Sequence, residues 1–334
     1  MAADLDRILG AIFGCALGDA LGLPAEGSTK EILAERYPQG LALPHATPTR
    51  GFPLNDVSDD TDQTVLMMRT LAAGYRDPTL NPATDFAARL RTWYDAGFPE
   101  LGDTSGMGCG GMTWRVLRRE DFLTDPFGAA RAIIGPKAGN GALMRTAPCA
   151  FTGDPAGWAS YLCRTTHSDP LCAASCVAQS LLVRELAAVP AGAPVEPECL
   201  RRALAPALAG LDERRRAEVM RWVRLSACLE DLDLGARDAR GYALKSFGCS
   251  VWAYRQLLAS PTRDAELFKR LTTRLVMEAG DADTNAAIAG AVLGAAVGYQ
   301  NLPAEWLAAL PHRDWLEAEV LDWAQTLGAA DHSV

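Results

Sequence analysis

Glycine recurs at every fourth position in two apolar segments near opposite ends of the chain, and this repeat constrains the fold more than any other feature. The positions are Gly10, Gly14, Gly18 and Gly22 in the first segment and Gly290, Gly294 and Gly298 in the second. Residues four apart lie on one face of a helix. Each interior helical glycine costs about 1 kcal/mol relative to alanine. Close approach of another helix offsets this cost, so the sequence predicts two central, tightly packed helices, with each other as candidate partners.

Apolar residues recur at helical spacing through most of the 334 residues, and no pair of alternating β-branched runs flanks a tight turn. Proline marks several helix starts, where its missing N–H costs nothing. We therefore predict an all-α fold with few or no strands. The predicted helices are Asp4–Gly22, Asp62–Gly74, Pro82–Ala96, Gly111–Arg118, Pro126–Ile134, Asn140–Pro148, Pro155–His167, Pro170–Ala188, Glu198–Ala209, Glu213–Cys228, Ser246–Leu258, Asp264–Glu278, Thr284–Tyr299, Ala304–Leu310 and Trp315–Leu327.

Composition narrows the class of protein and its location. No long Pro/Ser/Gly linker divides the chain and no repeat of solenoid period is present, so we predict one domain over residues 1–334. A net charge of -9, with 32 scattered Lys and Arg residues, argues against a general nucleic-acid binder. The nine cysteines form no CxxC pair, which favours buried thiols in a reducing compartment.

Two further features argue against export or a membrane partner. The N-terminal segment MAADLDRILG carries acids before its apolar run, which makes it a poor signal peptide. The longest apolar run, Asn285–Tyr299, is short for a membrane span and rich in glycine and alanine, as in a buried helix. We expect a cytoplasmic protein; the sequence does not indicate its oligomeric state.

Three separate segments carry acidic residues beside the predicted helices. Ser58–Thr61 reads Ser-Asp-Asp-Thr just before one helix, and Asp281–Thr284 reads Asp-Ala-Asp-Thr just before the second glycine-faced helix. Glu26 follows the first glycine-faced helix. If the two glycine-faced helices pack antiparallel, Glu26 comes close to the Asp281–Thr284 segment. The sequence thus predicts that distant acids converge at one place.

Five converging carboxylates would repel one another unless a divalent cation is bound. Oxygen ligands without His or Cys favour hard ions, so Mg²⁺ is expected first, with Mn²⁺ or Ca²⁺ as alternatives. Five acids exceed what one Mg²⁺ usually takes from protein, which indicates two ions roughly 3.5–4 Å apart. The hydroxyls of Ser58 and Thr284 are candidate ligands as well. The alternative is that each motif is an ordinary helix cap, since acids at helix N-termini are common.

Two glycine-rich loops are candidates for binding phosphate or ribose through backbone N–H groups. One contains Gly106, Met107, Gly108 and Gly110, and the other contains Gly139, Asn140 and Gly141. His167, at a predicted helix end, could reach a phosphate, and Glu100 lies in a loop after an aromatic pair. The alternatives are structural. The first loop would be a flexible connection, Asn140 would only cap a helix, His167 would only interact with the helix dipole, and Glu100 would be a solvated acid.

Taken in order, the motifs resemble the ADP-ribosylglycohydrolase family, which includes dinitrogenase-reductase-activating glycohydrolases and ADP-ribosylarginine and ADP-ribosylserine hydrolases. The resemblance extends from Ile8 to about Gly298. No single motif is decisive, but the ordered set is specific. The motifs are GDALGLPAEG (18–27), SDDTDQT (58–64), GFPELGD (97–103), GMGCGG (106–111), GNGALMR (139–145), THSDP (166–170) and GDADTNAAIAGAVLGA (280–295).

The resemblance implies a compact orthogonal multi-helix bundle with a dinuclear Mg²⁺ centre. It implies metal ligands from Ser58, Asp59, Asp60, Asp281, Asp283 and Thr284. It implies catalytic roles for Glu26, Asp60, Asp283 and Glu100, and an ADP-ribose pocket lined by Gly106, Met107, Gly108, Gly110, Gly139, Asn140, Gly141 and His167. Ser58 stands where many relatives have Thr, and Glu100 where Asp is frequent; neither departure removes a ligand.

The expected activity is Mg²⁺-dependent hydrolysis of the glycosidic bond between ADP-ribose and a modified acceptor. An acidic mouth around Glu26 and Glu100 suits a guanidinium, so protein arginine is favoured slightly. Serine-linked or nucleic-acid-linked ADP-ribose is the alternative substrate. The alternative classes are a different metal-dependent enzyme such as a phosphatase, a catalytically silent ADP-ribose-binding protein, and a purely structural helical protein. The expected partner is an ADP-ribosylated protein or a small-molecule ADP-ribose conjugate, with nucleic acid only as a modified substrate.

Overall fold

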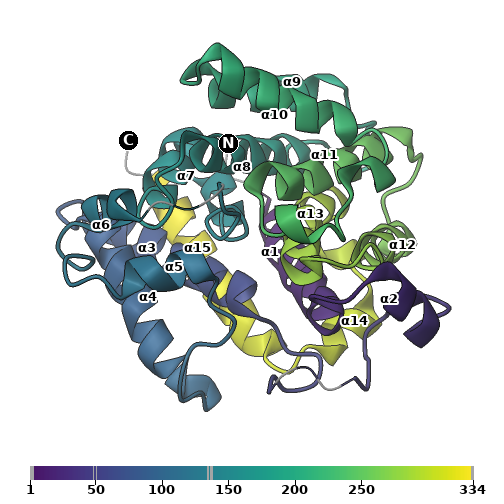
Figure 1. The fold of residues 1–334 in the computed structure, drawn as a ribbon, viewed down its shortest axis with the longest axis horizontal. Coiled ribbons are helices and arrows are strands. Elements are labelled where there is room, and N and C mark those ends of the chain that lie inside the picture. Colours follow the sequence, from purple (N-terminus) through teal and green to yellow (C-terminus); the bar gives the residue numbers. More distant parts are fainter. Residues whose placement is uncertain (1–3, 48, 50, 134, 136–137, 332–334) are drawn as a thin grey trace.

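The computed structural model describes residues 4–47, 49, 51–133, 135 and 138–331, and it contains fifteen α-helices and no β-strand within those ranges (Figure 1). The all-α prediction is confirmed. The helices are α1 Leu5–Gly22, α2 Lys30–Arg36, α3 Asp59–Arg76, α4 Pro82–Ala96, α5 Gly111–Leu117, α6 Pro126–Ala132, α7 Pro155–Cys163, α8 Pro170–Ala187, α9 Glu198–Ala209, α10 Glu213–Leu225, α11 Ala243–Ala259, α12 Ala265–Val276, α13 Ala282–Val297, α14 Ala304–Ala309 and α15 Arg313–Asp331.

The two glycine-faced segments form α1 and α13, which lie antiparallel against each other in the centre of the molecule (Figure 1). Every residue of α13 is buried, and α1 is buried from Arg7 to its end. Such all-round burial explains why neither helix has a polar face. The two glycine-faced helices pack on each other, so the predicted pairing is confirmed.

The glycine faces touch backbone to backbone. A Cβ atom added to Gly14 would lie 2.3 Å from the carbonyl oxygen of Gly290, and one on Gly290 would lie 2.1 Å from that of Gly14. Gly10 and Gly294 meet in the same way, since a Cβ on Gly294 would lie 1.9 Å from the Gly10 oxygen. No side chain fits between the two helices at these positions, so the contact requires glycine on both sides.

The other helices surround this pair. Helices α8, α11 and α12 pack on α13, while α3 lies between α4 and α15 on the other side of the core. In Figure 1, α9 and α10 form an outer layer above α8 and α11, and α2, α12 and α14 lie together on the right. The fold therefore places the ends of α1, α3 and α13 in the interior, covered from several directions.

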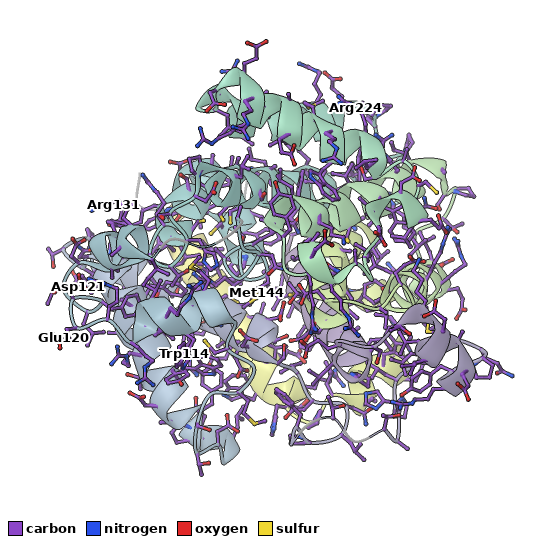
Figure 2. All side chains as sticks on the ribbon, in the orientation of Figure 1. Trp114, Glu120, Asp121, Arg131, Met144 and Arg224 are labelled. Atoms are coloured by element: carbon purple, nitrogen blue, oxygen red, sulfur yellow. The ribbon has the colours of Figure 1, made fainter. Side chains whose placement is uncertain are left out.

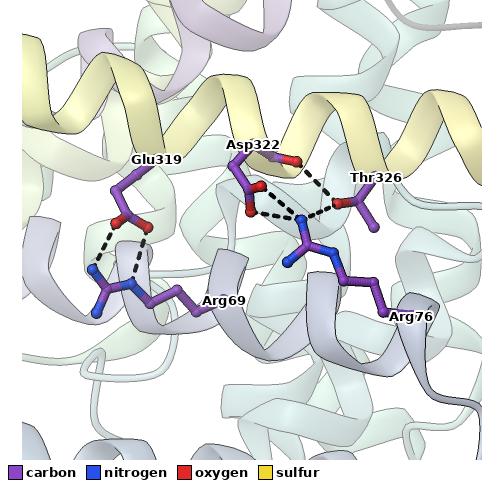
Figure 3. A network of polar contacts seen from close by, with 5 residues as sticks. All are labelled: Arg69, Arg76, Glu319, Asp322 and Thr326. Carbon is purple, nitrogen blue, oxygen red and sulfur yellow. Dashed lines mark hydrogen bonds and ion pairs between the residues drawn. The ribbon is translucent and has the colours of Figure 1, made fainter.

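Two arginines of α3 fasten it to α15 near the C-terminal end of the described chain (Figure 3). The guanidinium of Arg69 donates to both carboxylate oxygens of Glu319, at 2.9 and 2.6 Å. About two turns further along α3, Arg76 donates to Asp322 and to the hydroxyl of Thr326. Bidentate pairing of this kind orients as well as attracts. It holds α3, whose first residues carry acids, against a second long helix.

Two local helix predictions need correction. Asn140–Pro148 was expected to be a helix, but it is a series of turns followed by the 3₁₀-helix Ala147–Phe151. Pro148 cannot donate a backbone hydrogen bond, and the Thr146 hydroxyl donates to the carbonyls of Ala142 and Leu143. Helix α2 was not expected, because Leu33 is the one buried residue among its seven, which leaves no apolar periodicity to recognise.

Among the described residues, helix length and composition single out one segment that could span a membrane. The segment Leu5–Ala25 is long and apolar enough by that test, but 94% of its most apolar 18-residue stretch is buried inside the protein. A core helix of a globular protein passes the same test. Burial against α13 accounts for its composition.

We expect Gly14→Ala to lower the free energy of unfolding by about 3 kcal/mol or more, because the added Cβ would overlap the α13 backbone. The matched control is Gly74→Ala in α3, where the nearest atom to an added Cβ is 3.8 Å away. That variant should gain up to about 1 kcal/mol from helix propensity. Urea unfolding of both variants measures the difference; equal stability would contradict the close contact.

Candidate functional site

A cleft of about 820 Å³, including its open mouth, lies where the end of α1 meets the beginnings of α3 and α13. Two helix N-termini therefore face it, with their unpaired backbone N–H groups and positive dipole ends. Its lining comes from segments spread over the whole chain: Leu23, Glu26, Phe52, Ser58, Asp59, Asp60, Gly108, Gly110, Gly111, Met112, Thr113, Gly139, Asn140, Gly141, Met144, His167, Gly241, Asp281, Asp283 and Thr284. In Figure 2, Met144 lies near the middle of the molecule, with Trp114 of α5 to its left.

Asp60 joins the two acidic segments at the bottom of the cleft. Its Oδ2 accepts from the Thr284 hydroxyl at 3.2 Å, across 224 positions of sequence, and lies 3.1 Å from the Ser58 hydroxyl. Its Oδ1 is buried and has no hydrogen-bond partner among the residues that the structure describes. Burial, followed by the nearby charges of Asp19 and Asp283, raises the pKa of Asp60 well above its ordinary value. A buried carboxylate oxygen without a partner is costly unless a ligand satisfies it.

The other acids of the cleft are also held in conditions that disfavour their ionised form. Burial raises the pKa of Asp59 to about 8, with the charges of Asp19, Asp281 and Glu26 adding to the shift. Burial and the charges of Asp281 and Glu26 raise the pKa of Asp283 well above its usual range. Without a cation, this cluster is stable only when partly protonated.

Glu26, Asp281 and Asp283 form the outer part of the cluster. Each can offer one carboxylate oxygen, and these three atoms lie within 4.8 Å of one another. Arg240 forms an ion pair with Glu26. The side-chain amide of Asn140 donates to Asp281 Oδ2 at 2.6 Å, so the second glycine-rich loop is joined directly to the acids.

Asp19 is the important site residue that the sequence analysis missed. It is fully buried in α1 and accepts four hydrogen bonds, from the backbone and hydroxyl of Ser58 and from those of Thr61, between 2.6 and 3.1 Å. Burial raises its pKa to about 6 against these bonds, which lower it. It anchors the start of α3 to α1. The signal was present, since Asp19 is the one charged residue in an apolar run of small residues from position 8 to 25.

The cluster fits a hard divalent cation. It supplies carboxylate and hydroxyl oxygens from Ser58, Asp59, Asp60, Asp281, Asp283 and Thr284. The side-chain nitrogens of Asn140 and Gln63 that contact Asp281 and Asp59 are amide N–H donors, which do not compete as metal ligands. The buried partnerless oxygen of Asp60 is the strongest observation for it. The capping alternative holds for Ser58, whose side chain accepts from Asp60 N at 3.3 Å, but the side chain of Asp281 at the N-cap position of α13 makes no capping bond.

His167 closes the inner end of the cleft beside the second glycine-rich loop. It is 3% exposed, and burial together with the Arg145 guanidinium lowers its pKa to about 3, so the ring is neutral. A Cβ on Gly139 would lie 3.2 Å from His167 Nε2, and one on Gly141 would lie 3.2 Å from its Cε1. Glycine at both positions therefore leaves the edge of the ring accessible from the cleft.

Three predicted site residues do not line this cleft. Glu100, in the 3₁₀-helix Pro99–Leu101, is paired with Arg69 of α3 at 2.8 Å. Gly106 packs on the Trp93 side chain, where an added Cβ would lie 2.7 Å from the ring. Met107 faces a neighbouring pocket. The ion pair to Arg69 turns Glu100 away from the acids, so no role at the cleft follows for it here. Gly108 and Gly110 of the same loop, like all remaining predicted residues, do line the cleft.

Fold and cleft together define a class: an all-helical protein with an acid-lined pocket that could hold a metal ion, beside two glycine-rich loops. A family model described as ADP-ribosylglycohydrolase matches residues 1–332. The chain belongs to the ADP-ribosylglycohydrolase family.

Individual relatives agree with this assignment. The chain is 28% identical over 318 residues to ADP-ribosyl-[dinitrogen reductase] glycohydrolase of Rhodospirillum rubrum, covering 91% of this chain and 90% of the relative. It is 25% identical over 331 residues to ADP-ribosylhydrolase ARH3 of Danio rerio, covering 90% and 85%. A solved structure called ADP-ribosylglycohydrolase-related protein complex matches 98% of this chain and 99% of its own, with a TM-score of 0.67 and 27% identity. The protein is accordingly a hydrolase that acts on ADP-ribose glycosidic bonds.

The raised carboxyl pKa values predict how Mg²⁺ binding depends on pH. Asp59 ionises near pH 4 when unfolded but near pH 8 when folded without metal, so its favourable contribution to stability is complete below about pH 4 and lost as the pH rises through about 8. A divalent cation such as Mg²⁺ would bind the ionised form of these acids. We therefore expect the rise in Tm on adding Mg²⁺ to be larger at about pH 8 than at about pH 5.5.

Differential scanning fluorimetry at the two pH values, with and without Mg²⁺, tests this expectation. The double variant Asp59→Asn, Asp60→Asn serves as the control and should show no Mg²⁺ effect at either pH. An equal rise at both pH values in the wild-type protein would contradict the assignment of the cluster as the metal site.

Proposed function

We propose that this protein is a Mg²⁺-dependent hydrolase that releases ADP-ribose from modified arginine side chains of proteins. The observation that carries the proposal is the convergence of buried acids from α1, α3 and α13, with a partnerless Asp60 oxygen, next to the glycine-rich loops and His167. Two Mg²⁺ ions are the natural number for so many carboxylates, and Mn²⁺ is a reasonable substitute.

The metal ligands would be the side chains of Ser58, Asp59, Asp60, Asp281, Asp283 and Thr284. When bound, divalent cations of this kind act as Lewis acids, lower the pKa of a bound water and orient ribose hydroxyls. They would also relieve the repulsion between the acids. Asp19 does not face the ions directly in this proposal; it holds Ser58 and Thr61 in place through its four accepted hydrogen bonds.

The reaction is a hydrolysis at the anomeric carbon of the ribose attached to the acceptor. The oxygen of a water forms a bond to that carbon as the carbon–nitrogen bond to the guanidine breaks. Glu26 is half-buried at the mouth and near Asp283, so it can accept the proton of the water and return one to the departing guanidine. Positive charge that develops on the ribose ring is stabilised by the surrounding carboxylates.

The preference for arginine is supported by a second pocket beside the cleft. It shares Phe52 with the cleft, includes Thr61 at the start of α3, and is lined by the carboxylates of Asp56, Asp62 and Asp103. Two basic side chains, His312 and Arg313, line it too, and burial raises the pKa of Asp62 well above its ordinary value and raises that of Asp56. The support for arginine is therefore hydrogen bonding: a guanidinium can donate several bonds to these carboxyl oxygens, whereas a serine hydroxyl donates one.

The remaining parts of the proposal concern context. The substrate would be an ADP-ribosylated protein or a small ADP-ribose conjugate, met in the cytoplasm, and residues 1–334 would act as one domain. Nine cysteines, none within a disulfide and most of them buried, are consistent with a reducing compartment.

We expect Asp60→Asn to reduce turnover of ADP-ribosylated arginine peptide by at least about a hundredfold, because the buried acid cluster loses a central oxygen ligand. Asp77→Asn is the matched control: it lies at the other end of α3, its carboxylate accepts from Thr79 N at 2.9 Å, and it lines neither pocket. The control should keep its activity. Full activity of Asp60→Asn in metal-replete buffer would remove the metal assignment.

A panel of substrates identifies the acceptor. We expect release of ADP-ribose from arginine-linked peptide to exceed release from serine-linked peptide and from ADP-ribosylated nucleic acid at equal concentration. The measurement is free ADP-ribose by chromatography, with a chelator-treated sample as control. Preference for the serine linkage would reject the arginine proposal, and binding of ADP-ribose without turnover of any substrate would indicate a silent binding protein.

A further inference from the structure

Arg145 is a fully buried cation for which the described residues provide no carboxylate partner within ion-pair distance. Its two terminal nitrogens donate to Gln63 Oε1 at 2.5 Å and to Thr166 Oγ1 at 2.7 Å, and its Nε has no partner. The group lies 4.8 Å from the centre of the Phe86 ring. Burying a charge without a counter-charge is costly, so its bonds to these two neutral groups require an explanation.

The first bond fixes the amide of Gln63. A guanidinium can only donate hydrogen bonds, so Gln63 must present its oxygen to Arg145 and its NH₂ group to the other side. There, Nε2 donates to Asp59 Oδ2 at 2.7 Å. One oxygen of Asp59 is thereby held by Gln63, and the backbone of Gly110 also bonds to this carboxylate, so the group is fixed in place at the cleft.

The second bond, from Arg145 to Thr166, fixes the direction in which the Thr166 hydroxyl donates its hydrogen. Its oxygen accepts from Arg145, and its other neighbour among the described residues is His167 Nδ1, at 2.8 Å. No further acceptor is within reach in that part of the chain, so the hydroxyl donates to Nδ1. A neutral imidazole that accepts at Nδ1 carries its proton on Nε2.

His167 Nε2 is on the side of the ring that the glycine-rich loop leaves open. It lies 3.2 Å from the place where a Cβ of Gly139 would be, and the ring lines the cleft. The Nε2–H group is thus a neutral hydrogen-bond donor directed at the cleft. An oxygen acceptor of a ligand, such as a phosphate or ribose oxygen, is the matching chemistry.

We propose that Arg145 is a positioning residue that sets the hydrogen-bond direction on both sides of the cleft: it turns the amide of Gln63 toward Asp59, and through Thr166 it holds His167 as the Nε2–H tautomer that donates to bound ADP-ribose. The identity of the ligand rests on the proposed function; the tautomer does not. Arg145 itself does not line the cleft, so its effect on the reaction is indirect.

Thr166→Val tests the histidine side of the proposal, and Thr165→Val is its matched control. Both threonines are fully buried at the end of the same helix, but the Thr165 hydroxyl donates to the Leu162 carbonyl at 2.7 Å and not to the histidine. Long-range ¹H–¹⁵N NMR correlations of the imidazole show which nitrogen carries the proton. His167→Gln assigns the signal among the four histidines.

In the wild-type protein and in Thr165→Val, we expect one tautomer with the proton on Nε2. In Thr166→Val, we expect the Nδ1–H form to become populated and the affinity for ADP-ribose, measured by calorimetry, to fall about tenfold. Protonation on Nδ1 in the wild-type protein would overturn the proposal. So would a Thr166→Val variant with unchanged tautomer and affinity relative to Thr165→Val.

Gln63→Leu and Arg145→Lys test whether Arg145 orients both the Gln63 amide and, through Thr166, the His167 ring. Gln63→Leu should change the affinity for Mg²⁺ and leave the histidine tautomer intact, while Arg145→Lys should change both, since one ammonium cannot reproduce the two-nitrogen fork. An Arg145→Lys variant that folds and keeps both properties would refute the common origin. If Arg145→Lys does not fold, the Thr166 and Gln63 variants still test each side.

These readouts separate the two proposals. Loss of turnover on every substrate, with the Nε2–H tautomer intact, would reject the proposed hydrolase activity alone. The reverse result, turnover with an Nδ1–H ring, would reject the role of Arg145 alone.

Discussion

The close contact between α1 and α13 is the constraint on which the rest of the structure depends. Because the two backbones touch through glycine, the end of one helix and the start of the other are fixed relative to each other within narrow limits. This contact also fixes the positions of the acids at the two helix ends, which are Asp19 and Glu26 on one side and Asp281 and Asp283 on the other. The close packing of the two helices offsets the cost of so many helical glycines, and it brings together at their ends acids that repel one another.

The site combines two uses of helix N-termini. Asp19 receives hydrogen bonds that tie the beginning of α3 to α1, and the acids that follow Ser58 remain directed at the cleft. Negative charge stabilises the first turn of a helix. Capping a helix and binding a ligand therefore use the same residue types at this position. This overlap explains how an acid cluster with strongly raised pKa values can exist at the ends of well-formed helices.

Much of the fold followed from the sequence because helix periodicity and the glycine repeat are local patterns with one physical meaning. The convergence of Glu26 with Asp281 and Asp283 was predictable for the same reason: antiparallel packing of two recognisable helices brings their ends together. Asp60 lies on α3, which is neither of these helices, so this argument does not place it. Glu100 was misplaced because its partner, Arg69, lies on a different helix and leaves no trace in the local sequence. The roles of Asp19 and Arg145 were missed since a buried charge is recognised by its three-dimensional partners and not by its neighbours in the chain.

The seam between α1 and α13 also limits how this chain can change over evolutionary time. In most helix pairs, a larger side chain on one helix can be accommodated by a smaller one opposite. Here Gly14 faces Gly290 and Gly10 faces Gly294, and no amino acid is smaller than glycine. A larger side chain on one helix therefore cannot be compensated by a smaller one on the other. Replacement of these glycines would require the two helices to move apart, which would separate the acids at their ends.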